Sequence, residues 1–200
     1  MEYIEDIKDS FDSVDPTQAP SEPPKLDPER YSAFVKNPSD ISEDVLYQLS
    51  DIITGHMNLR MKKNETGLVT TPNVVDRLMN AVTIVYIEEE GVPVGVASLT
   101  DPTQKNYMGF KPVELYSLQS GVNLEGRVLL DLFAIPDEYA DKGIAEEILA
   151  QIDALDVKVF AVTDLDDETT PMLLERFEFQ PMANIEIDSN EVPVTLWLRK

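Results

Sequence analysis

The chain has 200 residues, 42% of them hydrophobic, which is enough for one domain with a substantial core and a tail. It contains no cysteine and one histidine, so thiol catalysis, disulfides and metal sites built from cysteines or several histidines are excluded, and we expect no metal. The net charge of -22 opposes binding to nucleic acid or anionic membranes. It favours a basic amine or a basic protein as partner, although a salt-adapted or well-solvated surface explains it equally well.

The sequence contains no long apolar run and no basic-then-apolar leader. We therefore expect neither a membrane span, which needs about 20 apolar residues, nor a secretory signal. The expected location is the cytoplasm or a soluble assembly such as a virion.

Residues 1–38 are predicted to form an extended, acidic, proline-rich arm. Five prolines lie between Pro16 and Pro28, and apolar residues are few, so the segment buries too little surface to offset its ordering entropy. It is either a disordered terminus without a role or an anchor that lies across another chain. In the second case the chain forms a homo- or hetero-oligomer through apolar contacts of the arm, made by Tyr3, Ile4, Phe11 and Val14.

Residues 39–200 are predicted to form a single α/β domain. Serines near residue 40 can cap a first helix, and β-branched residues alternate in two later runs that indicate a hairpin. We expect a helix from Ser39 or Ser42 to about Met57, a helix at 73–80, hairpin strands at 82–88 and 92–100, and an added strand at 113–118. The irregular stretch 101–126 is a candidate specificity element.

The segment from Arg127 to Leu155 is the centre of the predicted domain. Residues 128–135 form an apolar run that ends at Pro136, which indicates a strand buried on both faces. After an acidic turn, Gly143 precedes a helix with one apolar face. A strand, a tight turn and a helix start bring free N–H groups and the positive end of a helix dipole to one place, which is a natural anion site.

This segment resembles the core motif of the GNAT (GCN5-related) acetyltransferases. In that family a loop of pattern (Gln/Arg)-x-x-Gly-x-(Gly/Ala) opens the helix after the central strand, and its amides hold the pyrophosphate of acetyl-CoA. Residues 140–145 read Ala-Asp-Lys-Gly-Ile-Ala, so Ala140 stands where Gln or Arg is usual. The resemblance implies acetyl-CoA as cofactor, with a loop site formed by Ala140, Asp141, Lys142, Gly143, Ile144 and Ala145 and its pantetheine arm along Phe133, Ala134 and Ile135.

The later elements follow the family's order over roughly residues 40–200. We expect a strand at 157–163, a helix that begins at Thr170 and ends at residues 179–182, and strands at 185–188 and 192–198. The family writes this helix as Leu-Tyr-x-x-x-Gly-Phe, and here Leu174 and Glu178 replace its tyrosine and glycine. The implied fold class is α/β (α+β), with a mixed, mostly antiparallel central sheet flanked by helices on both faces.

Acetyl transfer to an amine needs a base and an acid. Asp131 is the only acid in the apolar run, and it shares a strand face with Leu129, the position that aligns with the family's base. A hydrogen-bonded structural role within the sheet is the alternative for Asp131. Leu174 cannot protonate the leaving thiolate, so we assign that role to Tyr139, with Tyr116 as another candidate.

Two functions stay open. The first is an acyl-CoA N-acyltransferase acting on a basic amine, such as a lysine side chain or a polyamine. The second is a catalytically degenerate GNAT-fold binding or structural subunit that its arm anchors in an assembly. The intact helix start at Gly143 favours the first, and the missing Gln/Arg, tyrosine and glycine favour the second. An acidic decoy of nucleic acid rests on charge alone.

Overall fold

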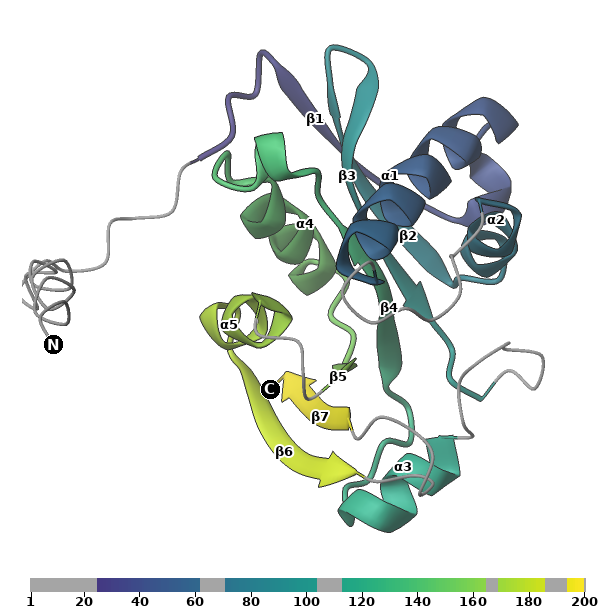
Figure 1. The fold of residues 1–200 in the computed structure, drawn as a ribbon, viewed down its shortest axis with the longest axis vertical. Coiled ribbons are helices and arrows are strands. Elements are labelled where there is room, and N and C mark those ends of the chain that lie inside the picture. Colours follow the sequence, from purple (N-terminus) through teal and green to yellow (C-terminus); the bar gives the residue numbers. More distant parts are fainter. Residues whose placement is uncertain (1–24, 62–70, 104–112, 165–168, 186–193, 200) are drawn as a thin grey trace, which may run out of the picture.

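The computed structural model describes residues 25–61, 71–103, 113–164, 169–185 and 194–199 (Figure 1). Seven strands form one sheet in the order β1-β2-β3-β4-β5-β7-β6. The strands are β1 (Tyr31–Lys36), β2 (Thr83–Glu89), β3 (Val92–Thr100), β4 (Val128–Ala134), β5 (Val159–Asp164), β6 (Phe179–Ile185) and β7 (Val194–Arg199). The helices are η1 (Pro38–Asp40), α1 (Glu43–Met61), α2 (Thr71–Met79), α3 (Val113–Ser120), η2 (Asp137–Tyr139), α4 (Ile144–Asp153) and α5 (Thr169–Arg176).

The sheet is mixed and mostly antiparallel. Of its neighbouring pairs only β4 and β5 run parallel within the part of the chain that is described. Helices α4 and α5 pack against one face, and α1 and α2 pack against the other. The predicted fold class is confirmed, and so is the central position of β4 between β3 and β5.

The two faces carry separate hydrophobic clusters. On the α4 face, Ile148 of α4 packs in one cluster with Leu130 of β4. On the α1 face, Leu49 of α1 packs with Leu132. A third cluster forms around Leu129. Its neighbour Leu130 packs on the α4 face, and successive strand residues point to opposite faces, so this cluster lies on the α1 face as well. Full burial of each such leucine or isoleucine contributes about 1.5–3 kcal/mol, so these stripes hold the helices in place.

Helix α4 lies unusually close to β3, and a glycine permits this approach. A Cβ atom built on Gly95 would lie 2.5 Å from Cγ2 of Ile144, the first residue of α4. That distance is far inside van der Waals contact, so a side chain at this position would push the start of α4 away from the sheet.

Three predictions at the level of elements are wrong. Residues 31–36, assigned to the arm, form edge strand β1, which pairs with β2 and stacks Phe34 on Tyr86 at 4.9 Å. The expected strand at 113–118 is helix α3, which ends at Gly121 with φ 69°. Residues 179–182 belong to β6 rather than to a helix end, because Glu178 turns the chain with φ 63°.

Several local predictions are confirmed. Ser42 caps α1, since its Oγ accepts a hydrogen bond from the amide of Val45 at 3.4 Å. The hairpin β2–β3 turns at Glu90 and Gly91, both with positive φ. Residues 1–24, which make up most of the predicted arm, lie outside the described residues. None of the helices described is long and apolar enough to cross a membrane.

Candidate functional site

Strands β4 and β5 separate part-way along their length. Their pairing joins Val128, Leu129 and Leu130 to residues 159–161. Beyond that point β4 continues against β3 alone, while β5 continues against β7. Among the described residues, the edge of β4 from Asp131 to Ala134 therefore has no pairing strand on the β5 side, and its main-chain groups can bind an extended ligand as a further strand would.

A β-bulge lies at the point of separation. Ser98 pairs with Leu132 and Leu99 with Leu130, so Asp131 is an extra residue on β4. Leu130 packs on the α4 face and Leu132 on the α1 face. Asp131 also turns to the α1 face, since it contacts Arg77 of α2. The bulge bends the strand and presents a carboxylate where the gap opens.

The open edge of β4 leads to the start of α4. After Pro136 and the short helix η2, Gly143 takes φ 82° and ψ 11°, a left-handed conformation that favours glycine, and no side chain caps α4. The first N–H groups of an α-helix have no partner inside the helix. The side chains of Ile144 and Ala145 are buried, so this turn offers its backbone rather than its side chains to a ligand.

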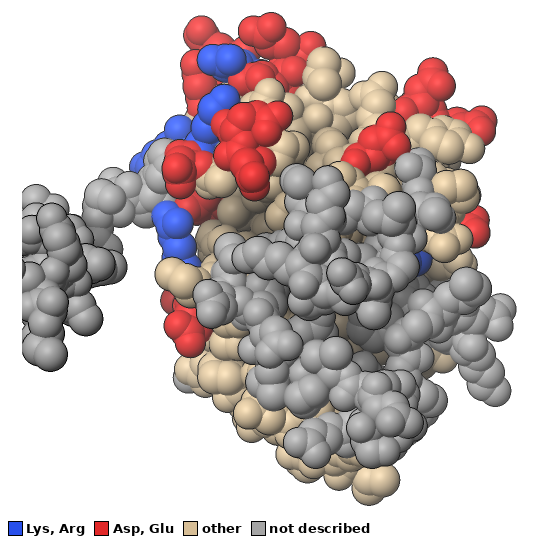
Figure 2. Space-filling view, viewed as in Figure 1, with Lys and Arg blue, Asp and Glu red and all other residues tan. Residues whose placement is uncertain are grey.

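The charge around this turn opposes an anion. Its acidic residues outnumber its single cation, Lys142, whose Nζ lies 4.3 Å above the ring of Tyr139. The acidic side chains are Asp137, Glu138, Asp141, Glu146 and Glu147. Ala140 is exposed and adds no charge. Figure 2 shows acidic side chains gathered at this end of the molecule, with basic side chains among them along one edge. Backbone geometry therefore favours an anion here, while the side chains weaken its binding.

Tyr139 fixes the turn to the edge of the sheet. Its hydroxyl donates a hydrogen bond of 2.9 Å to Oε2 of Glu89 at the end of β2, and Nε of Arg30 lies 2.6 Å from the other carboxylate oxygen. The bond to Glu89 raises the pKa of Tyr139, and hydrogen bonds from Tyr31 and Tyr139 lower the pKa of Glu89. The hydroxyl therefore keeps its proton and holds the loop. Its role as catalytic acid stays a prediction.

Asp131 is the most deeply buried charged side chain near the gap. Its side chain has 0% exposure, and Oδ1 lies 2.6 Å from Nη2 of Arg77, whose side chain is 22% exposed. Sequence reasoning missed Arg77, because nothing in α2 distinguishes it from a solvated helix arginine. The structure brings Asp131 to the open part of β4 but gives it a cationic partner, so its role as base stays a prediction.

The predicted cofactor residues come together in space. Phe133, Ala134 and Ile135 lead along the open edge into the loop, and Gly143–Ala145 start α4 at its end. Leu174, at the family's tyrosine position, is 2% exposed in the core of the α4 face, and the side chain of Tyr116 lies outside the described ones. Among the described residues, no group of three or more His, Asp or Glu side chains could hold a metal.

Comparison of the sequence with protein-family models and with curated proteins gives no match. Solved structures are similar. An acyl-CoA N-acyltransferase from Pseudomonas aeruginosa matches with a TM-score of 0.56 and 15% identity, over 85% of this chain and 99% of that one. The PaiA N-acetyltransferase from Thermoplasma acidophilum, solved with coenzyme A, matches with a TM-score of 0.56 and 10% identity. The match covers 84% of this chain and 99% of that one. ElaA from Escherichia coli matches with a TM-score of 0.54 and 10% identity, over 85% of this chain and 99% of that one.

These similarities extend over nearly the whole of each compared chain, although the sequence identities are low. Similarity at this level of identity concerns the fold alone. The chain therefore has the fold of the GNAT acetyltransferases.

Proposed function

We propose that the protein is an acyl-CoA-dependent N-acyltransferase that transfers an acetyl group from acetyl-CoA to an amine. One observation carries the proposal. The edge of β4 has no pairing strand on the β5 side after Leu130, and the chain then passes through η2 to the uncapped α4, which Gly143 precedes. A strand edge followed by a helix N-terminus suits an extended ligand with a diphosphate at one end.

The residues present fit acetyl-CoA through their main chain. The amides at the start of α4, from Gly143 to Ala145, would hold the diphosphate, and the free edge of β4 at Phe133–Ile135 would hold the pantetheine arm. When bound, the cofactor supplies an acetyl group activated as a thioester. The protein's part is to fix this group beside the bulge and to exclude water there, which converts a bimolecular encounter into an oriented one.

The acceptor nitrogen would form a bond to the acetyl carbon while the carbon–sulfur bond breaks, and one proton would pass overall from nitrogen to sulfur. In this proposal Asp131 would receive that proton once its contact with Arg77 loosens. In the related fold of PaiA, the solved complex contains coenzyme A. This supports the same cofactor here.

Calorimetry with acetyl-CoA and with CoA tests the proposal. We expect the affinity to rise as the salt concentration increases from a few millimolar to about 0.1 M. The acidic turn around Lys142 repels the phosphates, and salt screens this repulsion. A matched basic variant, Asp141→Lys, should bind more tightly than the wild type. The absence of binding to both ligands in both proteins would reject the proposal.

The second candidate is a non-catalytic GNAT-fold subunit of an assembly. Ala140, Leu174 and Glu178 favour it, because they stand where the resemblance implies a glutamine or arginine, a tyrosine and a glycine. In this case residues 1–24 would anchor the chain on a basic partner or on another copy. Removing these residues should then weaken assembly while the domain stays folded, and sedimentation at two salt concentrations measures both effects.

A further inference from the structure

One carboxylate ties three segments of the chain together beside the start of α4. Glu89 is the last residue of β2, and its side chain is 13% exposed. Its carboxylate accepts hydrogen bonds from the hydroxyl of Tyr31, at the start of β1, and from that of Tyr139, in η2. Nε of Arg30 lies 2.6 Å from Oε1 of the same carboxylate. We call Arg30, Tyr31, Glu89 and Tyr139 the Glu89 anchor.

Main-chain hydrogen bonds fix the β1 side of the Glu89 anchor. Tyr31 and Glu89 are directly opposite each other in the β1–β2 ladder. The carbonyl of Arg30 accepts a hydrogen bond from the amide of Glu90 at 3.1 Å. The carbonyl of Asp27 accepts the amides of Arg30 and Tyr31, at 3.1 and 2.9 Å. The two side chains from β1 therefore stay beside Glu89 as long as this edge of the sheet is intact.

The other side of the anchor is a closed turn. The amide of Tyr139 donates to the carbonyl of Pro136 at 2.8 Å, and the carbonyl of Tyr139 accepts the amide of Lys142 at 3.2 Å. Nζ of Lys142 lies 4.3 Å above the ring of Tyr139. Gly143 follows at once and precedes α4. A movement of Tyr139 therefore also moves Lys142 and the backbone at the helix start.

The two tyrosine rings pack beside the same helix start. Both belong to the cluster on the α4 face that contains Ile144 and Ala145. Apolar packing holds a ring against the cluster but does not set its direction, whereas a hydrogen bond does. The hydroxyl bonds to Glu89 therefore decide how the turn is oriented against β1 and β2.

We infer that Glu89 is a positioning residue for acetyl-CoA, and that through it the start of β1 forms part of the cofactor site. This inference rests on the proposed function and extends the site beyond the loop of the GNAT resemblance. The amides at the start of α4 would bind the diphosphate, and Glu89 acts on them through Tyr139. A turn that is ordered before the ligand arrives loses less conformational freedom on binding, so the affinity is higher.

The negative charge of Glu89 separates this role from simple electrostatics. A carboxylate near the turn repels phosphate groups, so its removal should tighten binding if charge alone matters. Loss of the anchor loosens the turn and should weaken binding. Glu89→Gln therefore changes the affinity in opposite directions under the two explanations. Tyr31→Phe and Tyr139→Phe keep every charge at neutral pH and remove one hydroxyl each.

Calorimetry with acetyl-CoA on the full chain tests the inference. Tyr139→Phe and Glu89→Gln should each weaken binding by about three- to tenfold, and Tyr31→Phe by about twofold or more. S-acetylpantetheine, followed by NMR titration, has no diphosphate, so the same variants should bind it as the wild type does. A change that merely lowered the stability of the fold would affect both ligands or neither.

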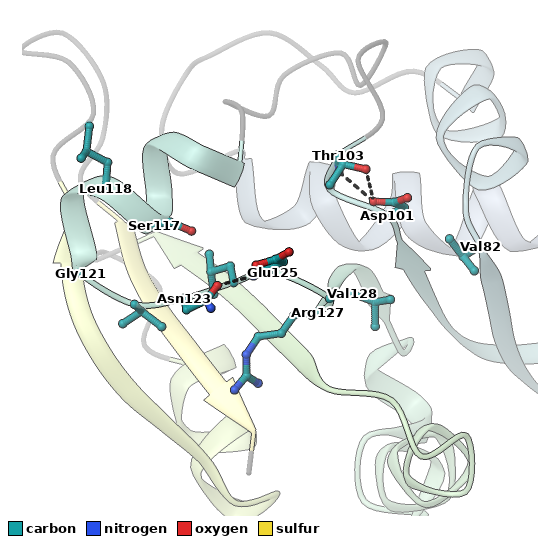
Figure 3. Close-up of a pocket in the computed structure, with 13 residues that line it drawn as sticks. Val82, Asp101, Thr103, Ser117, Leu118, Gly121, Asn123, Glu125, Arg127 and Val128 are labelled. Carbon is teal, nitrogen blue, oxygen red and sulfur yellow. Dashed lines mark hydrogen bonds between the residues drawn. The ribbon is translucent and has the colours of Figure 1, made fainter.

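Thr103→Val is the matched control. Oγ1 of Thr103 donates to Oδ1 of Asp101 at 2.7 Å, which is also a bond from a hydroxyl to a carboxylate (Figure 3). Both residues line a pocket of about 1070 Å³, together with Val128, the first residue of β4. The turn follows the other end of this seven-residue strand, about 20 Å away along the sheet. Thr103→Val should therefore bind acetyl-CoA as the wild type does.

Two further measurements complete the test. Thermal melting shows that each variant is folded. Amide hydrogen exchange without ligand reports on the turn itself, and exchange at residues 140–145 should be faster in Tyr139→Phe and Glu89→Gln but not in Thr103→Val. Unchanged acetyl-CoA affinity in Glu89→Gln and both tyrosine variants would overturn the inference. So would tighter binding by Glu89→Gln with no change in the tyrosine variants, because charge alone would then explain the result.

The two proposals fail in different ways. If the wild type binds neither acetyl-CoA nor CoA, the proposed function fails, and the role of the Glu89 anchor in cofactor binding fails with it. If acetyl-CoA binds the wild type and all three anchor variants equally, the proposed function stands and only this inference is overturned.

Discussion

Removing either partner of the Arg77–Asp131 ion pair should destabilise the protein, and by unequal amounts. Asp131 has no exposed side-chain surface, so Arg77→Met leaves a buried carboxylate without its cation. Breaking a buried pair in this way costs about 3–5 kcal/mol. Arg77 is 22% exposed, so after Asp131→Asn the guanidinium can still reach water. We expect a smaller loss of about 1–3 kcal/mol in that variant.

Urea unfolding followed by circular dichroism measures the difference. With a slope of about 2 kcal/mol/M for a domain of this size, Arg77→Met should lower the midpoint by about 1.5–2.5 M and Asp131→Asn by about half of that. Arg77→Lys keeps the charge and is the control. Replacing both partners with Met and Leu should recover much of the stability, because two apolar groups remove the desolvation cost of the pair.

Equal losses below about 1 kcal/mol in both single variants would refute this reasoning, since such values are typical of a solvent-screened surface pair. Transfer activity per folded molecule separates structure from catalysis. If Asp131 is the base, Asp131→Asn should lose at least about 100-fold in kcat, whereas a purely structural Asp131 should lose stability alone.

The remaining predictions concern the turn before α4. Gly143→Ala should weaken acetyl-CoA binding severalfold in calorimetry, because φ 82° strains an L-residue and displaces the amides; unchanged affinity would argue against this site. Gly95→Ala should lower thermal stability, since its Cβ meets Ile144 at 2.5 Å, and an unchanged melting temperature would contradict the packing. Tyr139→Phe should raise the pKa of Glu89 toward its ordinary value. In the wild type the lowered pKa of Glu89 stabilises the fold above the pKa of an unfolded glutamate, and this is lost as the pH falls through the folded pKa. NMR titration of Glu89 in both proteins measures the shift, and identical curves would exclude the contact.

The cofactor half of the candidate site could be read from the sequence because its signals are local. An apolar run that ends at a proline, a glycine and an amphipathic helix lie within about 30 residues, and each restricts the backbone by itself. Strand β4, Gly143 and the start of α4 accordingly lie where the pattern predicts them. The same is true of the Ser42 cap and of the β2–β3 hairpin.

Other elements depended on context that the sequence pattern lacks. Residues 31–36 follow a proline-rich stretch, and only pairing with β2 makes them a strand. Residues 113–118 are rich in apolar residues, which favoured a strand, yet they form a helix, since β-propensity reflects packing on a sheet more than a backbone preference. Glu178 adopts the left-handed conformation for which the family uses glycine, which no propensity indicates.

The cluster of buried polar side chains on the α1 face was decided by tertiary structure. Arg77 and Asp131 are 54 residues apart in the chain, and they meet only because α2 packs over the bulge of β4. Ser98 and Thr100 read as ordinary strand residues, and their burial beside that pair follows from the register of β3 against β4. Sequence alone specified which backbone could hold a cofactor, because helix starts and strand edges are local features. Only folding decided which polar side chains meet at the bulge of β4, since that depends on which distant segments the sheet brings together.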